Sequence, residues 1–392
     1  MFSKRFPRHA EINELTRTLQ RLRAEGASIT DLTDSNPTRV GVTYPDDLLD
    51  DLSSEAARRY EPHSLGLRSA REAVAADYGR RGARVDPDHV VLSASTSEAY
   101  SWIFKLLCDP GQAVLVPEPS YPLFEHLTGA EGVKAVAYQL RYHGRWEIDI
   151  DSLAAAPSDT RAVLLVSPNN PTGSFVSRLE ANRMAALCRE RGWAIVADEV
   201  FADYALDEAA AVTECAMNLG VLSLTLGGAS KTLGLPQVKL AWMVVDGPPA
   251  DRDRALGALE LIADMYLSVS TPVQVAAPSL LARGEAIRRQ IRARVAANLA
   301  RARQLIPRYP ACTPLPVEGG WSLVVRVPST RSEEALVLDL LERERILVHP
   351  GYFFDFPHEA FIVVSLLPPE EVFADALDRA LCVATSVGGG RP

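Results

Sequence analysis

The sequence lacks the features of a metalloprotein, a disulfide-rich secreted protein or a membrane protein. Its seven histidines show no paired metal-ligand spacing, and its five cysteines are odd in number and widely separated. No apolar run approaches the length that spans a bilayer. The start carries basic residues without a following apolar core, so we expect no secretory signal and a cytoplasmic location. We predict no metal site and reduced core thiols at Cys108, Cys188, Cys215, Cys312 and Cys382.

The chain also lacks an excess of positive charge. It has 41 Lys and Arg against 50 Asp and Glu, a formal net charge of −9, which argues against a nucleic-acid partner. One predicted helix is locally basic, and the helical spacing of its arginines among apolar residues indicates a solvated face. These arginines are Arg288, Arg289, Arg292, Arg294, Arg301 and Arg303.

Length and composition allow one large domain and a smaller one. The 392 residues are 47% hydrophobic and 23% charged, which is typical of a globular protein with ample core. From residue 89 onward, wholly apolar strands alternate with helical segments. This pattern predicts a mainly parallel sheet covered by helices on both faces, whose ligands bind at the carboxyl ends of the strands.

The pattern changes in the last third of the chain. Two helices are expected at about 251–267 and 273–306, the second long enough to bridge two domains, and a compact α+β unit follows. A helix at 10–25 begins the chain. We predict an α/β protein divided into an N-terminal arm that belongs to the small domain (1–45), a large ligand-binding domain (46–272), and a linker helix with the small C-terminal domain (273–392).

Lys231 lies between two apolar segments that are predicted to be buried strands, 221–226 and 240–245. Removal from water favours the neutral form of a lysine, and a neutral amine can attack a carbonyl to form a Schiff base. We interpret Lys231 as an imine-forming lysine. From this segment alone, a loop lysine with its ammonium group in solvent is an equally good interpretation.

Four loops after predicted strands carry polar residues suited to one anionic, aromatic, nitrogenous ligand. Residues 93–97 lead into a helix and offer backbone N–H groups and hydroxyls to a phosphate. Tyr121 opens a helix and can stack on a flat ring. Residues 167–173 bring two amides to the sheet edge, and the carboxylate of Asp198 can pair with a protonated pyridine nitrogen. Taken singly, each also fits an ordinary cap, core residue or turn.

Together these sequence segments resemble those of the pyridoxal-phosphate-dependent aminotransferases of fold type I, the class I and II group, and the resemblance covers roughly residues 10–385. The segments 167–173, 198–200 and 230–231 have the family's order and spacing. The resemblance implies pyridoxal 5'-phosphate as cofactor, held by Lys231 as a Schiff base. It also implies transfer of an amino group between an amino acid and a 2-oxo acid through pyridoxamine phosphate, with Lys231 as the proton shuttle.

The resemblance also assigns the residues that contact the cofactor. Asp198 would pair with the pyridinium nitrogen, Asn170 would donate to the phenolic oxygen, and Tyr121 would stack on the ring. The phosphate would be held by Ser95, Thr96 and Ser230. Tyr60 matches a tyrosine that reaches the phosphate of the neighbouring subunit, so a homodimer is expected.

The sequence departs from the family at several positions of the site. Lys239 replaces the usual phosphate-binding arginine, which keeps the charge but loses the bidentate fork. Phe201 replaces a tyrosine that donates to the phenolic oxygen. Val363 stands where an arginine clamps the α-carboxylate of the substrate. Arg39 and Arg68 are candidate replacements for that arginine, although both fit surface positions equally well.

These departures keep two other interpretations open. The missing clamp and Phe201 favour a lyase, cyclase or oxidase that uses the same cofactor on an amino acid. A cofactor-binding protein without catalysis is a further alternative, against which the intact Lys231, Asp198 and Asn170 argue. An aromatic group can line a pocket for an apolar substrate or belong to the core of the small domain: Trp321, Tyr352, Phe353, Phe354 and Phe356.

Overall fold

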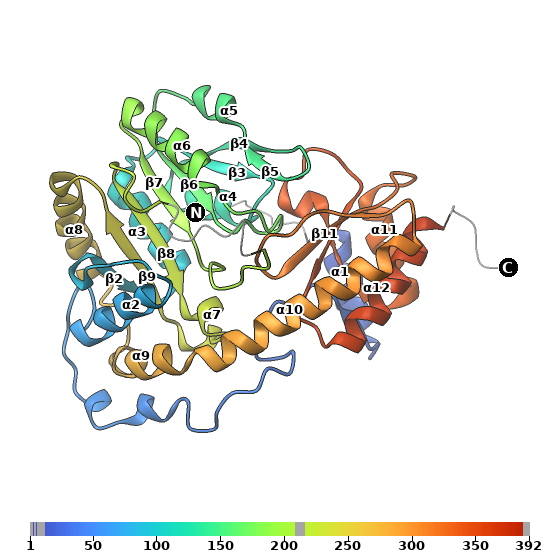
Figure 1. Cartoon of the computed structure of the whole chain (residues 1–392), viewed down its shortest axis with the longest axis horizontal. Coiled ribbons are helices and arrows are strands. Elements are labelled where there is room, and N and C mark those ends of the chain that lie inside the picture. The colour runs from blue at the N-terminus through green and yellow to red at the C-terminus, as the bar shows by residue number, and fades with distance from the viewer. Residues whose placement is uncertain (1–2, 4, 6–11, 208–215, 387–392) are drawn as a thin grey trace.

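The computed structural model describes residues 3, 5, 12–207 and 216–386 of the chain. Figure 1 shows a larger body built on a sheet and a smaller body, with the helix α10, Glu285–Leu305, running between them. Cys215 and the first residues of the helix predicted at 10–25 lie outside the described residues. The described part of that helix is α1, Glu14–Ala24. The other four cysteines are free thiols.

The larger body contains a sheet of eight strands. Their bounds are β2, Val90–Ser93; β3, Ala113–Glu118; β4, Lys134–Tyr142; β5, Trp146–Ile148; β6, Thr160–Val166; β7, Ala194–Asp198; β8, Ser223–Gly228; and β9, Ala241–Asp246. The spatial order is β2-β9-β8-β7-β6-β3-β4-β5. From β8 to β4 neighbouring strands are parallel, whereas β9 and β5 are antiparallel to their neighbours.

Helices cover both faces of this sheet because successive side chains of each strand point to opposite faces. On β6, Leu164 packs in one core while Val163 and Leu165 pack in the other. The first core includes side chains of α3, Thr96–Leu107, α4, Phe124–Glu131, and α8, Pro249–Asp264. The second includes side chains of α5, Ile150–Ala154, and α6, Arg178–Arg191. The predicted mainly parallel, doubly covered sheet is confirmed.

The order of the strands fixes where a ligand binds. After β3 the chain moves outward to β4 and β5, then returns to the other side of β3 as β6 and continues to β7 and β8. The loops after β3 and β6 therefore leave in opposite directions, and the crevice between such loops is the usual ligand site of these sheets. Tyr121 follows β3 and Asn170 follows β6, so the topology brings both to this crevice.

The single helix predicted at 273–306 is wrong, because the chain forms two helices there. They are α9, Thr271–Arg283, and α10, with Gly284 between them. Gly284 has φ −65°, an ordinary helical value, so its conformation alone does not require glycine. Its position does: a β-carbon there would lie 2.2 Å from Cδ2 of Leu233. Close packing of α9 on α2, Arg68–Arg80, accompanies this break.

The smaller body combines a four-stranded sheet with the helices α11 and α12 and the N-terminal arm. The order is β10-β11-β14-β13, and the described arm joins through a parallel pair between β1 and β12. The bounds are β1, Thr30–Asp31; β10, Thr313–Pro314; β11, Ser322–Arg326; β12, Ile346–Leu347; β13, His349–Pro350; β14, Phe361–Ser365; α11, Glu333–Asp339; and α12, Glu370–Thr385. This confirms the predicted α+β unit, while the bounds of the three predicted segments stay a prediction.

Among the described residues, no helix is both long and apolar enough to cross a bilayer.

Candidate active site

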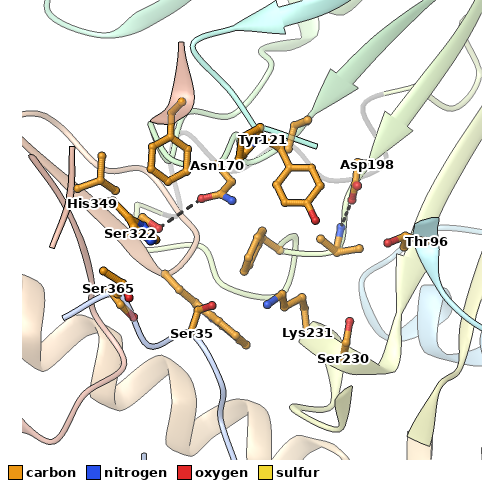
Figure 2. Close-up of a pocket in the computed structure, with 18 residues that line it drawn as sticks. Ser35, Thr96, Tyr121, Asn170, Asp198, Ser230, Lys231, Ser322, His349 and Ser365 are labelled. Atoms are coloured by element: carbon orange, nitrogen blue, oxygen red, sulfur yellow. Dashed lines mark hydrogen bonds between the residues drawn. The ribbon is translucent and has the colours of Figure 1, made fainter. Parts of the chain in front are cut away.

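A cavity of about 340 Å³ lies at the carboxyl ends of the parallel strands, where the two bodies meet. This volume is within the range of small-molecule sites. Figure 2 shows Lys231 near its centre, with Asp198 and Thr96 on one side and Ser322, His349 and Ser365 on the other. Six of the predicted site residues line the cavity: Thr96, Tyr121, Asn170, Asp198, Ser230 and Lys231.

Lys231 lies on α7, Ala229–Thr232, directly after the buried strand β8. Its Nζ is 4.8 Å from the ring centroid of Trp321 and 5.3 Å from that of Phe201. Burial lowers the pKa of Lys231 to about 8, although the negative charge of Asp198 acts in the opposite direction. About a tenth of this amine is therefore uncharged at pH 7, far more than for an ordinary lysine, and the neutral form is the nucleophile.

Asp198 ends β7 and points into the cavity. Its Oδ2 accepts a hydrogen bond from the hydroxyl of Tyr100 at 3.0 Å, and Oδ1 accepts one from the N–H of Val200 at 3.2 Å. Burial raises the pKa of Asp198 to about 6, while these hydrogen bonds and Lys231 lower it. The carboxylate is thus ionised at neutral pH and available to a cationic ligand group.

The two asparagines that follow β6 have different surroundings. Asn169 is buried and fixes the turn, since its Nδ2 donates to the carbonyl of Pro119 at 3.0 Å and its Oδ1 accepts from the hydroxyl of Ser120 at 2.6 Å. Asn170 faces the cavity, where its Oδ1 accepts a hydrogen bond from the hydroxyl of Ser322 at 3.4 Å (Figure 2). Only Asn170 can therefore contact a ligand directly.

A glycine in this turn allows close packing against the smaller body. Gly173 has φ +71°, a left-handed value that favours glycine, and a β-carbon there would lie 2.6 Å from the carbonyl oxygen of Gly319. The carbonyl of Gly173 accepts the N–H of Gly319 at 2.9 Å. This contact places Trp321 and Ser322, which follow shortly after, beside the asparagine turn at the cavity wall.

The N-terminus of α3 forms the side of the cavity suited to an anion. Its first N–H groups have no partners within the helix and carry the positive end of the helix dipole. Thr96 and Ser230 line the cavity there. The hydroxyl of Ser95 instead caps the helix by accepting the N–H of Glu98 at 3.1 Å, and Ser95 does not line the cavity.

Two other predicted cofactor residues lie away from the cavity wall. Lys239 follows a short 3-10 helix with a left-handed φ of +58°, and its side chain is exposed. Tyr60 is also exposed, with 68% of its surface accessible. Neither lines the cavity of the described chain.

Aromatic rings build much of the apolar cavity wall. Tyr121 lies edge-on to Phe124, at 5.8 Å between centroids, and Phe201 lies edge-on to Trp321 at 5.2 Å. Of the aromatic group after residue 351, only Phe354 lines the cavity, whereas Phe356 packs on Trp146 and Phe361 in the interior, at ring-centroid distances of 5.8 Å and 4.8 Å. Phe354 therefore fits the interpretation as pocket lining, and Phe356 fits the interpretation as core.

Two tyrosines that support the site were missed in the sequence. Tyr100 lies four residues after Thr96 on α3, a spacing that puts both on the same helix face. A helical projection could therefore have shown that Tyr100 faces the site, where it contacts Asp198. Tyr204 is fully buried, and its hydroxyl donates to the carbonyl oxygen of Lys231 at 2.6 Å. No local pattern signals this second contact, because 27 residues separate its partners.

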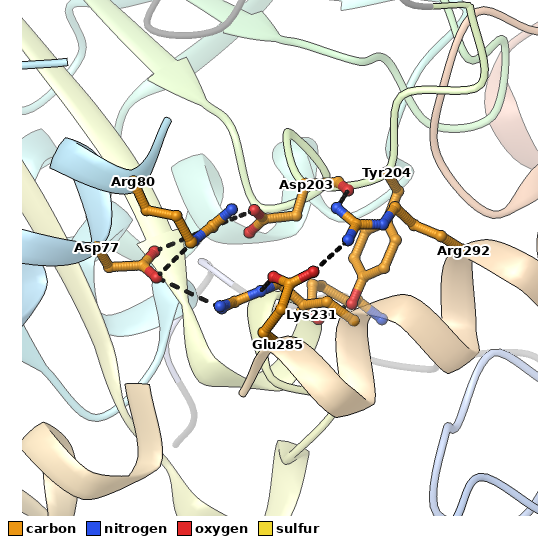
Figure 3. Close-up of polar contacts among 8 residues, drawn as sticks. Asp77, Arg80, Asp203, Tyr204, Lys231, Glu285 and Arg292 are labelled. Atoms are coloured by element: carbon orange, nitrogen blue, oxygen red, sulfur yellow. Dashed lines mark hydrogen bonds and ion pairs between the residues drawn. The ribbon is translucent and has the colours of Figure 1, made fainter. Parts of the chain in front are cut away.

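A network of ion pairs links α2, α10 and Asp203 (Figure 3). Arg288 of α10, predicted to lie on a solvated face, is instead 1% exposed and pairs with Asp77 of α2 at 3.4 Å. Arg80 joins Asp77 to Asp203, which precedes Tyr204 in the chain. The solvated-face prediction was wrong for Arg288 because its guanidinium turns inward to pair with Asp77, while Arg289, Arg301 and Arg303 are exposed as predicted.

Replacement of Asp77 is expected to destabilise the fold strongly. Asp77→Ala removes the carboxylate between Arg80 and Arg288, so the buried guanidinium of Arg288 loses one of its two acidic partners. Breaking a buried pair in this way costs about 3–5 kcal/mol. Urea unfolding measures the loss. Glu72→Ala, which removes an exposed partner of Arg68, is the control and should cost less than about 1 kcal/mol. Equal losses in both variants would contradict the account of this network.

Comparison with known proteins identifies the family. The model of the family described as aminotransferase class I and II matches residues 38–378. The chain belongs to the class I and II aminotransferases. It is 28% identical over 359 residues to the glutamate-pyruvate aminotransferase AlaA of Escherichia coli, covering 89% of this chain and 88% of that protein. It is 30% identical over 377 residues to an alanine aminotransferase of Mycobacterium bovis, covering 92% and 86%.

The solved structures agree with this assignment. A crystal structure of an aminotransferase from Escherichia coli superposes with a TM-score of 0.87 at 26% identity and covers 99% of both chains. The aminotransferase described here therefore moves an amino group between an amino acid and a 2-oxo acid. Its relatives are transaminases, which favours this reaction over the lyase, cyclase, oxidase and non-catalytic alternatives.

Proposed function

We propose that this aminotransferase works with pyridoxal 5'-phosphate held in the cavity around Lys231. The donor set fits that group: an amine of lowered pKa, a buried carboxylate, an amide, a flat ring and a helix N-terminus all face one space. When bound, the cofactor supplies an aldehyde that bonds to amines and a protonated ring that accepts an electron pair. The single observation on which the proposal depends is that Lys231 and Asp198 line the same cavity.

Each side chain then has a specific task. Asp198 holds the proton on the ring nitrogen, because its carboxylate is ionised at neutral pH. Asn170 donates from its amide to the phenolic oxygen, and Tyr121 supports the ring face. Thr96, Ser230 and the N–H groups of α3, including that of Ser95, hold the phosphate. The exposed Lys239 supplies further positive charge at a distance.

Lys231 has two successive tasks in the cycle. Its Nζ would hold the cofactor through a covalent bond. The same Nζ would also take the proton from the reacting carbon of the substrate and later return it. The buried hydroxyl of Tyr204 fixes the backbone of Lys231, so that Nζ moves from a constant anchor.

The pKa of Lys231 predicts how cofactor capture by the cofactor-free enzyme depends on pH. Because its pKa is lowered to about 8, the neutral fraction of the amine rises about tenfold per pH unit below 8 and then levels off. Stopped-flow absorbance should show the capture rate following this curve. In Asp198→Asn the negative neighbour that raises the pKa of Lys231 is absent, so the midpoint should move to lower pH. A midpoint near the ordinary lysine value would contradict the burial of this amine.

The proposal includes a homodimer in which Tyr60 reaches the phosphate of the neighbouring subunit. The loop carrying Tyr60 is tied to the end of α8, where Ser64 donates to Asp264 at 3.0 Å. Next to it lies a group of exposed apolar side chains, which is a feature of interaction surfaces: Leu261, Met265, Tyr266 and Leu267. Sedimentation velocity should give a dimer, and Leu261→Glu with Met265→Glu should give monomers. A monomeric native protein would contradict this part of the proposal.

Transamination is tested with amino donors in the absence of a 2-oxo acid. Our proposal predicts that one equivalent of bound cofactor is converted to its amine form and that the reaction then stops. Addition of a 2-oxo acid should restore the original spectrum. Continued turnover without an acceptor would favour a lyase or oxidase instead.

A further inference from the structure

The substrate end of the cavity has an apolar side chain where the family places its carboxylate clamp. Val363 and Ser365 on β14 both line the cavity, and Val363 is 2% exposed. In the antiparallel sheet Val363 is in register with Val324 of β11 and His349 of β13. The position is therefore fixed at the cavity wall by pairing on both sides, and a hydrocarbon group stands there.

Neither candidate arginine takes over the task of the clamp. Arg39 is exposed and does not line the cavity. Arg68 lies on α2, where its Nε contacts Glu72 at 2.7 Å and its Nη1 contacts Asp88 on the surface. In the part of the chain that the structure describes, Lys231 is the only lysine or arginine that lines the cavity, and the proposed function commits it to the cofactor.

The remaining polar groups at this end are uncharged. Figure 2 shows Ser35, Ser322, Ser365 and His349 on the side away from Asp198. The hydroxyl of Ser365 accepts the N–H of Leu367 at 3.2 Å, so its own proton is free to be donated. Burial lowers the pKa of His349, although the charge of Asp31 opposes this, so the imidazole is neutral at pH 7. Within the described residues of one chain, this end of the cavity thus offers hydrogen bonds without a positive charge.

A surface that offers hydrogen bonds but no cation binds uncharged polar groups better than carboxylates. A carboxylate that leaves water needs a cation or several strong donors, because burying an unpaired charge is costly. A bidentate arginine supplies both charge and geometry, and Val363 supplies neither. A carboxamide or hydroxyl group, in contrast, needs only the hydrogen bonds that serines and a neutral imidazole provide.

We propose that the amine bound best by this enzyme carries an uncharged polar group, such as a carboxamide or a hydroxymethyl group, on its reacting carbon. Free amino acids are then bound less tightly than such amines. In the half-reaction the donor would lose the nitrogen and the hydrogen of its reacting carbon, and water would supply the oxygen of its new carbonyl group. The cofactor would take up that nitrogen, the proton and the electron pair, and its aldehyde oxygen would leave as water. This inference rests on the proposed function, because the cofactor places the reacting carbon beside Lys231.

Equilibrium binding tests the preference without turnover. 2-Aminoisobutyric acid and its amide have no hydrogen on the reacting carbon, so they bind to the holoenzyme but do not transfer their amino group. Calorimetry should give at least about tenfold tighter binding of the amide, a difference of about 1.4 kcal/mol. Val363→Arg should reverse the order, and Val363→Met, which adds bulk without charge, should preserve it. Tighter binding of the acid by the native enzyme would overturn the proposal.

Single-turnover conversion separates this proposal from the proposed function. The probes are L-phenylalanine, L-phenylalaninamide and L-phenylalaninol, followed by the absorbance of the bound cofactor. Faster conversion by the amide or the alcohol supports the proposal. If the free acid converts the cofactor faster than both, transamination stands and only the inference about the substrate fails. If none of the three converts the cofactor, the proposed function fails and the inference with it.

Discussion

Lys231→Ala is expected to abolish both covalent cofactor binding and turnover. Loss of the amine removes the bond to the aldehyde and the group that moves the proton. Proton transfer alone is worth about 10²–10⁴-fold in rate, so we expect a loss beyond about 10⁴-fold when both tasks are removed. Absorbance spectra measure the bond, and a coupled assay measures the turnover. The cavity is otherwise intact in this variant, because the hydrogen bond from Tyr204 ends on the backbone oxygen of Lys231.

Two further variants separate the chemistry of Lys231 from its charge. Lys231→Arg keeps a cation in the cavity but cannot bond to the aldehyde at neutral pH, so it should be as inactive as Lys231→Ala. Lys134→Ala removes an exposed lysine on β4 and should leave spectrum and turnover unchanged. A native spectrum in either Lys231 variant would show that another amine holds the cofactor and would contradict the assignment.

Asp198→Asn is expected to leave the cofactor bound but nearly inert. The carboxylate stabilises the protonated ring nitrogen, and the ring accepts an electron pair only when that nitrogen is protonated. The amide is similar in size, so the cavity keeps its shape. Removal of one hydrogen-bond donor that stabilises developing charge lowers rates by about 10²–10³-fold in other enzymes, and we expect a loss of at least this size in turnover when a full charge is removed. The bound spectrum and the rate of a half-reaction measure the two parts of the effect.

Tyr100→Phe provides a graded comparison for Asp198→Asn. It removes one hydrogen bond to Asp198 and keeps the carboxylate, so the pKa of Asp198 should rise above about 6. A hydrogen bond to a charged group is worth about 1.5–3 kcal/mol, which limits the loss of activity near pH 7 to roughly tenfold. The loss should become larger as the pH falls toward 6. Full activity of Asp198→Asn would contradict the proposed task of this carboxylate.

The sequence predicted the parts of the site that depend on local order. Asp198 is the last residue of a buried strand, and Lys231 and Asn170 each come within four residues of the end of one. The end of a parallel strand is a position that an apolar run reveals. The turn after β6 was predicted for a similar reason, because its proline and asparagine residues are strong turn signals. These residues meet in one cavity because the sheet places its strand ends side by side.

Features that depend on distant contacts escaped prediction. At the break, Gly284 packs against the side chain of Leu233, about fifty residues earlier in the sequence, while the helical pattern continues through the break. Arg288 is buried because Asp77 of α2 pairs with it, and a helical pattern of arginines carries no sign of that partner. The hydrogen bond from Tyr204 to Lys231 likewise joins residues that are distant in the sequence.

Hydride reduction followed by peptide mapping tests the central claim most directly. The native protein is incubated with pyridoxal 5'-phosphate, reduced with borohydride, digested and analysed by mass spectrometry. We predict one reduced cofactor per chain, attached to Nζ of Lys231. A protein that stays unmodified, or that carries the cofactor on another lysine, would contradict the account of the active site given above.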